Sequence, residues 1–249
     1  MGREYLEGRR ALAEALSAKT PVERVWAGAA ASKDKTVAKL LERARKKGAQ
    51  IVPATAEQLD AHSSHGAHQG VIASVAPYAY ATLPDLVARA KGQDNALVVA
   101  CDHITDAGNL GAIARSAEVV GATGLLLPNR RSARVTAATY KTSAGAVAHL
   151  PIAMEANLAR SLGFLKDEGF WIIGASERAR TCAWDAPLSG RVALVVGSEG
   201  KGLASLVEKT CDLLVSLPQK GKVGSLNVAQ AATVLAYEWM RQCSAGSPS

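Results

Sequence analysis

Ser225-Leu226-Asn227 opens an apolar helical segment near the C-terminus, and two earlier segments share its character. One is Asn109-Leu110-Gly111-Ala112-Ile113-Ala114-Arg115-Ser116, which follows the apolar run Ala96 to Cys101. The other is Gly197-Ser198-Glu199-Gly200-Lys201-Gly202-Leu203, which follows Val192 to Val196. In the last two cases a strand-forming run stops at a turn rich in Gly or Asn. Such turns at the carboxyl ends of strands bind ligands in open α/β sheets, because they expose backbone amides and glycine allows close approach.

The three turns carry few charges, so they predict a site for a small organic ligand rather than for a metal or a row of phosphates. A phosphate loop needs Gly-Lys-Ser/Thr after four intervening residues. Gly197 and Gly202 have that separation, but Leu203 stands where the lysine belongs. The cysteines are scattered without a C-x-x-C pair, so we expect no structural zinc; they are Cys101, Cys182, Cys211 and Cys243.

Composition sets the frame for the fold and the partners. The chain has 249 residues, 48% of them hydrophobic and only 4% aromatic, which predicts one large domain or two modest ones with an Ala, Val and Leu core. A net charge of +7 is compatible with a polyanionic partner. No apolar run approaches the roughly 20 residues that span a bilayer. Isolated cysteines and the absence of an apolar segment after Met1-Gly2-Arg3-Glu4 predict a reduced cytoplasmic location without export.

The pattern changes near Pro77, where we expect a domain boundary. Residues 1–76 predict a small α/β domain, in which the helix Asp34 to Lys47 is the clearest element. Its apolar positions have helical spacing and Gly48 follows as a C-cap. Residues 77–95 are predicted as a linker and connecting helix. From 96 to 243, continuous apolar strands alternate with helices, which predicts a mostly parallel sheet covered on both faces.

In that order and near those separations, the three segments resemble the three motifs of the SPOUT-class RNA 2'-O-ribose methyltransferases of TrmH type. The resemblance extends from Ala96 to Arg241. The N-terminal domain, which ends in His68-Gln69-Gly70-Val71, is similar to the ribosomal-protein-L30-like RNA-binding domain of the two-domain members. Within the class, the chain is most similar to bacterial enzymes that methylate a guanosine of 23S ribosomal RNA.

The resemblance implies a C-terminal domain with a deep trefoil knot, a feature that general folding rules would not predict. It implies S-adenosylmethionine as the methyl donor and no metal. The partners would be RNA, with ribosomal RNA expected and tRNA as the alternative, and a second copy of the chain in a homodimer, with no membrane. Carried over position by position, the cofactor-binding residues would be Gly197, Leu217 and Leu226, with Ser198, Gly202 and Ser225 in the loops around them.

The resemblance also implies catalytic roles for five residues: Asn109 and Arg115 in the first motif, Glu199 in the second, and Ser225 and Asn227 in the third. Methyl transfer to a ribose 2'-hydroxyl requires that the hydroxyl lose its proton as it attacks. A free arginine is almost never deprotonated. Arg115 is therefore better suited to stabilise the developing alkoxide, or to orient a phosphate or water, and the proton acceptor stays open.

Each motif residue also has an ordinary interpretation when taken alone. Asn109 and Asn227 precede helical segments, where Asn is a common N-cap, and Glu199 between glycines suits an exposed turn. The family often has Asp-Pro before its first motif, and Ala107 replaces that proline here. Because all three motifs occur in the family's order, the sequence favours a functional role for these residues together over separate ordinary roles.

Two other functions stay open as alternatives. One is the same chemistry on tRNA, or on the ribosomal adenosine whose methylation confers thiostrepton resistance. The other is a catalytically silent RNA-binding or ribosome-assembly factor, against which the intact motif residues argue.

Two further segments have no assigned role. A basic loop-to-helix segment suits phosphate contacts and a solvated face equally well; it contains Arg130, Arg131, Arg134 and Lys141. A polar loop with His62, His65 and His68 suits an RNA contact, or a surface loop without a particular role, better than a metal site.

Overall fold

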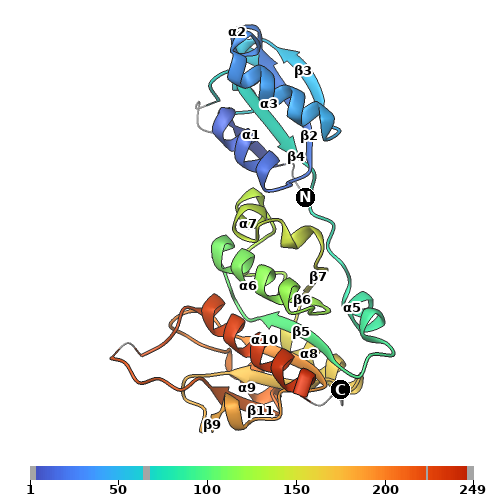
Figure 1. Ribbon diagram of the computed structural model, residues 1–249, viewed down its shortest axis with the longest axis vertical. Helices are drawn as coiled ribbons and strands as arrows, with labels where there is room; N and C mark the ends of the chain where they lie inside the picture. The colour runs from blue at the N-terminus through green and yellow to red at the C-terminus, as the bar shows by residue number, and fades with distance from the viewer. Residues whose placement is uncertain (1–3, 64–67, 223, 246–249) are drawn as a thin grey trace. The chain divides into compact units, whose positions relative to one another are not determined.

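The computed structural model describes residues 4–63, 68–222 and 224–245 (Figure 1). The chain forms two compact units, and each is described here by itself. The first unit consists of Met1–Ala79 and Val135–Gly145, and the second of Tyr80–Arg134 and Ala146–Ser249.

A four-stranded sheet of order β1-β4-β2-β3 forms the first unit, with β4 antiparallel to β1 and β2, and β2 parallel to β3. The strands are β1 (Glu4–Glu7), β2 (Val22–Gly28), β3 (Gln50–Ala54) and β4 (Val71–Val75). The helices are α1 (Gly8–Ser17), α2 (Ala29–Lys33), α3 (Lys35–Lys46), α4 (Ala56–Asp60) and α7 (Ala137–Thr142).

Helix α3 confirms the helical periodicity predicted between residues 34 and 47. The Asp34 side chain caps it by accepting hydrogen bonds from the backbone N–H groups of Thr36 and Val37. Its apolar stripe is buried in a core shared with α1 and the sheet. Because that stripe alone is apolar, the helix is held by packing on one face.

A seven-stranded sheet of order β7-β6-β5-β10-β8-β11-β9 forms the second unit, and its paired strands are all parallel. The strands are β5 (Ala96–Cys101), β6 (Gly124–Pro128), β7 (Ile152–Glu155), β8 (Trp171–Ala175), β9 (Thr181–Cys182), β10 (Arg191–Val196) and β11 (Leu213–Ser216). The helices are α5 (Leu83–Ala90), α6 (Ala107–Val119), α8 (Leu158–Asp167), α9 (Ser205–Thr210) and α10 (Val228–Ala245), with short turns η1 (Ala146–Ala148) and η2 (Ala183–Asp185).

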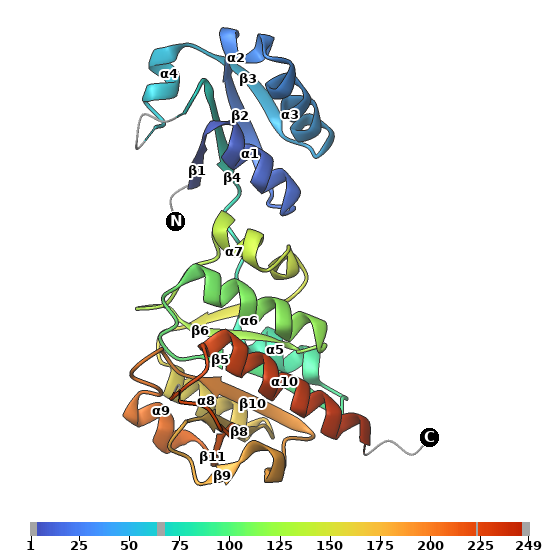
Figure 2. The same cartoon turned by 60° about the vertical axis from the view of Figure 1, so that its left-hand side comes forward.

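Helices cover both faces of this sheet, as continuous apolar strands require. Helices α6 and α10 lie side by side (Figure 2), joined by a hydrogen bond of 2.6 Å between Ser116 Oγ and Thr233 Oγ1. Helices α5, α8 and α9 pack into the core of the second unit through buried side chains such as Leu86, Leu162 and Val207. The predicted α/β class and mostly parallel sheet are therefore confirmed.

Strands β5 and β10 are neighbours in the centre of the sheet although about 90 residues separate them. Their adjacency brings the loop after β5 and the loop after β10 to the same edge. Strand order and register do not define how the chain threads, so the trefoil knot stays a prediction. Across the described ranges, no helix is both long and apolar enough to cross a bilayer.

Candidate functional site

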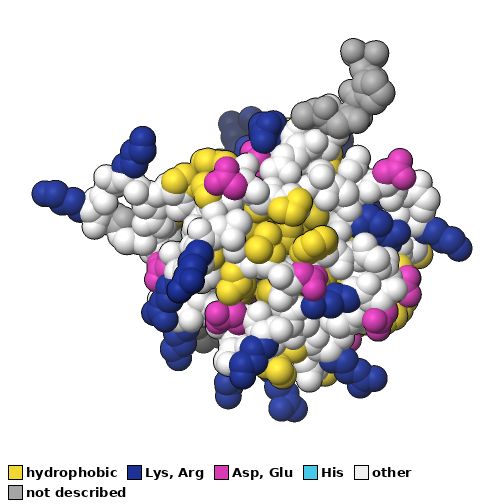
Figure 3. All heavy atoms as spheres, turned by 90° about the horizontal axis from the view of Figure 1, so that it is seen from below, with side chains coloured by type: hydrophobic (Ala, Val, Ile, Leu, Met, Phe, Trp, Pro, Cys, Tyr) yellow, Lys and Arg dark blue, Asp and Glu magenta, His cyan; other side chains and the backbone are white. Residues whose placement is uncertain are grey.

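A cavity of about 620 Å³ opens at the carboxyl ends of β8, β10 and β11, in the second unit. Its volume lies in the range of small-molecule sites. Four segments and one residue of α9, Glu208, line it. The segments are 175–178 at the end of β8, 196–203 after β10, 215–219 at the end of β11, and 225–228 with the first turns of α10. Figure 3 views the molecule from the side on which β9 and β11 lie. Exposed hydrophobic side chains gather in the middle of that view, and charged side chains of both signs surround them.

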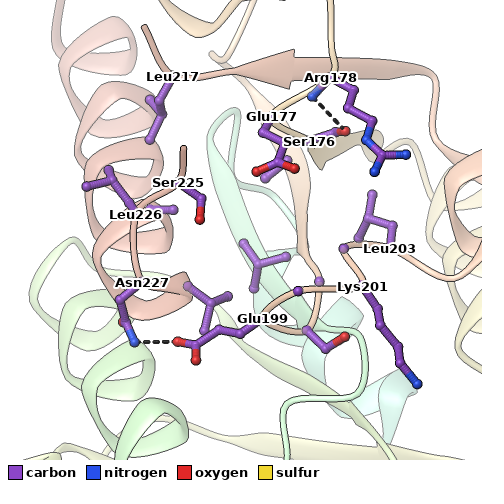
Figure 4. A pocket seen from close by; sticks show the side chains of 18 of the residues that line it. Ser176, Glu177, Arg178, Glu199, Lys201, Leu203, Leu217, Ser225, Leu226 and Asn227 are labelled. Carbon is purple, nitrogen blue, oxygen red and sulfur yellow. Dashed lines mark hydrogen bonds between the residues drawn. The ribbon is translucent and has the colours of Figure 1, made fainter. Parts of the chain in front are cut away.

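A hydrogen-bonded cluster at the edge of the cavity joins one residue from each of the three predicted motifs. Asn109 donates from Nδ2 to Glu199 Oε1 over 3.2 Å. Asn227 donates from Nδ2 to the same Glu199 oxygen over 2.5 Å and to Asn109 Oδ1 over 3.0 Å. Figure 4 shows the Asn227–Glu199 bond at the end of the cavity. The fold thus brings together side chains that lie 28 to 118 residues apart in sequence.

The capping interpretation is wrong for Asn109 and right for Asn227. Asp106 is the N-cap of α6, since its Oδ1 accepts from the backbone N–H of Asn109 over 2.6 Å. Asn109 therefore lies inside the first turn with its side chain free to reach Glu199. Asn227 both caps α10 and joins the cluster. Its Oδ1 accepts from the Ala229 N–H over 2.9 Å, and its Nδ2 donates to Glu199.

The loop after β10 folds back on itself beside the cavity. Ser198 and Gly202 exchange backbone hydrogen bonds of 3.1 and 2.9 Å, and Gly202 has φ +65°. A Cβ atom on Gly197 would lie 2.2 Å from the Gly202 carbonyl carbon, so that position excludes any side chain. This tight backbone turn, the cradle of residues 197–202, forms one wall of the cavity.

A hydrophobic wall faces this cradle. Leu217 and Leu226 line it, and Leu226 is 46% exposed. Ser225 lies beside them and its hydroxyl points into the cavity (Figure 4). All predicted cofactor residues therefore lie on the cavity wall.

The cavity lining includes neither Asn109, which bonds to Glu199 at its edge, nor Arg115. Arg115 is exposed on α6, six residues after Asn109, which at 100° per residue places it well round the helix from Asn109. The following residue, Ser116, contacts α10. The catalytic role of Arg115 stays a prediction.

Sequence reasoning missed the segment Ser176-Glu177-Arg178, which follows β8 and lines the cavity. Figure 4 shows the Glu177 carboxylate near the middle of the cavity. The signal was available, because β8 ends at the same sheet edge as β10 and polar residues follow it at once. It was overlooked because the segment lacks a glycine turn.

The charges on the lining favour a ligand that carries both a cation and a carboxylate. The acidic side chains are Glu177, Glu199 and Glu208, and the basic ones are Arg178 and Lys201. No group of three or more His, Cys, Asp or Glu in the described ranges is arranged to hold a metal ion.

Two cysteines of the second unit, the buried Cys101 and the partly buried Cys211, are unsuited to nucleophilic chemistry. Burial raises the pKa of the Cys101 and Cys211 thiols to about 12, which keeps both protonated near neutral pH.

The two unassigned segments have structural contacts. Arg134 donates to the Asn129 carbonyl over 2.8 Å, and Lys141 pairs with Glu14 at 3.0 Å in the first unit. His68 Nε2 lies 3.0 Å from Asp60 Oδ1, and the His62 ring stacks on Tyr5. The third histidine of the polar loop, at position 65, lies outside the described residues.

Comparison with known families gives two matches that together span most of the chain. The SpoU rRNA methylase family model matches residues 96–237. A model for RNA 2'-O ribose methyltransferase substrate binding matches residues 5–81.

Two curated relatives are similar over 240 residues, or 96% of this chain. An uncharacterized tRNA/rRNA methyltransferase of Synechocystis is 39% identical, and the match covers 62% of its length. Another from Mycolicibacterium smegmatis is 41% identical, and the match covers 76% of its length. The chain thus spans about three fifths to three quarters of the length of these relatives.

Among solved structures, the SpoU methyltransferase AviRb from Streptomyces viridochromogenes, in complex with its cofactor AdoMet, is similar at a TM-score of 0.70. It is 26% identical, and the match covers 97% of this chain and 90% of that one. A tRNA-modifying enzyme of A. aeolicus is similar at a TM-score of 0.54 and 25% identity, covering 64% of this chain and 81% of that one.

Proposed function

The chain belongs to the SpoU rRNA methylase family, a family of S-adenosylmethionine-dependent RNA methyltransferases, and we propose that it methylates a ribose 2'-hydroxyl of structured RNA. We propose further that the target is a guanosine of 23S ribosomal RNA. The match of residues 5–81 to a 2'-O ribose methyltransferase substrate-binding domain supports the ribose as the acceptor. The resemblance to bacterial guanosine methyltransferases supports the nucleotide.

The observation that carries this proposal is the Asn109–Glu199–Asn227 cluster. It joins the three motifs at the rim of a cavity with the size and mixed charge that S-adenosylmethionine needs. A silent RNA-binding factor has no need for a cluster of this kind beside a ligand cavity.

The residues of the cavity fit the methyl donor. The tight backbone turn at Gly197 and the half-exposed Leu226 both lie on the cavity wall, where bound S-adenosylmethionine would contact them. We therefore assign cofactor binding to Gly197, Leu217 and Leu226, with Ser198, Gly202 and Ser225 beside them. The sulfonium supplies the activated methyl group. The chain's own residues orient the acceptor and hold it away from water.

Within the proposed reaction, Glu199 accepts from the amides of Asn109 and Asn227 and so ties the loop after β10 to α6 and to the start of α10. Arg115 carries a permanent positive charge, so its role is to stabilise the oxygen that loses its proton, or to hold a neighbouring phosphate. Because Arg115 lies outside the cavity lining, its partner is the RNA and not the cofactor.

A homodimer is the proposed assembly. Helix α10 and the turn η2 present a shallow, mainly apolar surface lined by Trp184, Thr233, Val234, Tyr237 and Met240 together with the ion-paired Glu238 and Arg241. Trp184 is 47% exposed and Tyr237 43% exposed. Large exposed aromatic side chains on one patch are typical of protein interfaces, and a second copy of α10 is the occupant that the family resemblance implies.

The test uses the purified full chain, methyl-labelled S-adenosylmethionine and RNA from a strain that lacks the gene. A ribose 2'-O-methyl group blocks alkaline cleavage at its own phosphodiester, so mass mapping of resistant dinucleotides identifies both the position and the acceptor atom. We expect one 2'-O-methylguanosine in 23S ribosomal RNA.

Label on a base would overturn the ribose as acceptor, and label only in tRNA, or on the thiostrepton-site adenosine, would overturn the nucleotide. Binding of S-adenosylmethionine without transfer to any RNA would favour the silent factor.

A further inference from the structure

Asp102 and His103 form a side-chain pair directly after β5. Asp102 is fully buried and both of its carboxylate oxygens are used. Its Oδ2 accepts from the backbone N–H of Ala204 over 2.6 Å, and its Oδ1 lies 2.5 Å from His103 Nδ1. Since a carboxylate only accepts, His103 Nδ1 carries the hydrogen. In that tautomer, Nε2 is a hydrogen-bond acceptor.

The His103 backbone is held in the left-handed region, with φ +59°. Residues with a Cβ atom rarely adopt this conformation unless their surroundings impose it. The bond to Asp102 accompanies this conformation, and the imidazole side chain is 39% exposed. In the described part of the chain, Nε2 has no hydrogen-bond partner. The fold therefore aims an acceptor nitrogen at solvent in a fixed orientation.

A basic loop lies beside this histidine. The Ile104 carbonyl, one residue further along, accepts from the Ala133 N–H over 2.7 Å and so ties the loop after β5 to the loop after β6. That second loop carries Arg130 and Arg131, both exposed. Within the described ranges neither arginine pairs with a carboxylate. The two loops end the neighbouring strands β5 and β6, at the sheet edge that also carries the motif cluster.

We propose that these two loops form a contact surface for the RNA backbone, with Arg130 and Arg131 on phosphates and His103 Nε2 accepting a hydrogen bond from a ribose 2'-hydroxyl. Phosphate oxygens only accept, so they suit the arginines. A 2'-hydroxyl can donate, so it suits the acceptor nitrogen of the tautomer whose Nδ1 donates to Asp102. The inference rests on the proposed function, because it takes RNA as the substrate. It adds a site in the catalytic unit that distinguishes RNA from DNA.

The first test is His103→Gly in the full chain. Glycine adopts a positive φ freely, so the variant removes the imidazole without straining the loop. Binding is measured to a 23S ribosomal RNA transcript that contains the methylated nucleotide and to DNA of the same sequence. We expect the affinity for RNA to fall about fivefold, the scale of one hydrogen bond. The affinities for DNA and S-adenosylmethionine should stay unchanged. An unchanged preference for RNA over DNA would overturn the role of His103.

The second test is the double variant Arg130→Ala/Arg131→Ala, with Lys91→Ala/Lys209→Ala as the matched control. Lys91 precedes β5 and Lys209 precedes β11, so the control removes the same charge at the opposite edge of the sheet. If both arginines contact phosphates, the slope of log affinity against log salt should fall by about 1.4 to 1.8 in magnitude. The control slope should not change. Equal slopes for both variants would contradict the proposal that Arg130 and Arg131 contact RNA phosphates.

The two levels of proposal fail in different ways. A wild-type chain that binds neither ribosomal RNA nor tRNA overturns the proposed function and this inference together. A wild-type chain that methylates RNA while His103→Gly and the arginine variant match it in binding overturns this inference alone.

Discussion

Asn227 Nδ2 lies 2.5 Å from Glu199 Oε1, and this bond ties the start of α10 to the loop after β10. The same Asn227 side chain caps α10 through its oxygen. One residue therefore fixes the helix that walls the cavity and the carboxylate at its rim. Loss of its amide should disturb both the fold and the site, and the two effects can be separated.

Asn227→Ala should lower the free energy of unfolding by about 1 kcal/mol, the usual cost of an N-cap, and methyl transfer by at least ~10²-fold. Asn157→Ala is the matched control, because Asn157 caps α8 by accepting from the Arg160 N–H over 3.0 Å. The control should lose similar stability in thermal unfolding and keep full turnover. Equal loss of turnover in both variants would show that the effect is only structural.

Arg115→Ala should leave S-adenosylmethionine binding within about tenfold, roughly 1.4 kcal/mol, because the side chain lies outside the cavity lining. It should lower methyl transfer by at least ~10²-fold, the scale of a positioned catalytic group. Calorimetry and single-turnover methylation measure the two quantities. Glu199→Ala should be milder, because that residue mainly holds its loop. Near-normal turnover of Arg115→Ala contradicts its assigned role.

Gly197→Ala should abolish detectable cofactor binding, because the new Cβ atom would lie 2.2 Å from the Gly202 carbonyl carbon and force the cradle open. Gly163→Ala is the control, since α8 leaves open space at that position. Titration calorimetry should show wild-type affinity for the control and none for Gly197→Ala. Binding by both would mean that the cradle does not hold the cofactor.

S-adenosylmethionine should bind with unchanged affinity in excess chelator. The cavity offers backbone groups, hydroxyls and leucine side chains as contacts, which need no metal bridge. Calorimetry with and without the chelator makes the comparison. A loss of binding on metal removal would contradict the assignment of the site.

Sequence periodicity predicts the strands and helices because each buries a recognisable face. The helix 34–47 and the apolar strands β5 and β10 are examples. The motif loops could be placed at strand ends for the same reason. Pairing across the sheet is not encoded locally. Asn109 and Glu199 meet only because β5 and β10 are neighbours, an adjacency that no single segment reveals.

The Asp102–His103 pair shows the same limit. In the sequence, Asp102 is an ordinary polar residue after a strand. In the fold it is completely buried, and both of its carboxylate oxygens have hydrogen-bond partners. Segment 135–145 is another example. It follows β6 in the chain but clusters with the first unit, where Lys141 pairs with Glu14. Such contacts depend on tertiary packing, so the sequence alone does not predict them.

The chain should be a dimer at micromolar concentration, with twice the chain mass of 25.8 kDa in light scattering. The reason is the apolar surface on α10, where Tyr237 is 43% exposed. Tyr237→Glu places a charge in the middle of that surface, and burying an unpaired charge is costly, so this variant should be a monomer.

Phe164→Glu is the control for dimerisation, because Phe164 is a similarly exposed aromatic residue, 36% exposed, on α8. Helix α8 packs in the core cluster with α5 and α9, away from the α6–α10 pair. The control should stay dimeric. If the wild-type chain is a monomer at micromolar concentration, or if both variants dissociate alike, the α10 surface packs against no second copy and the proposed assembly is wrong.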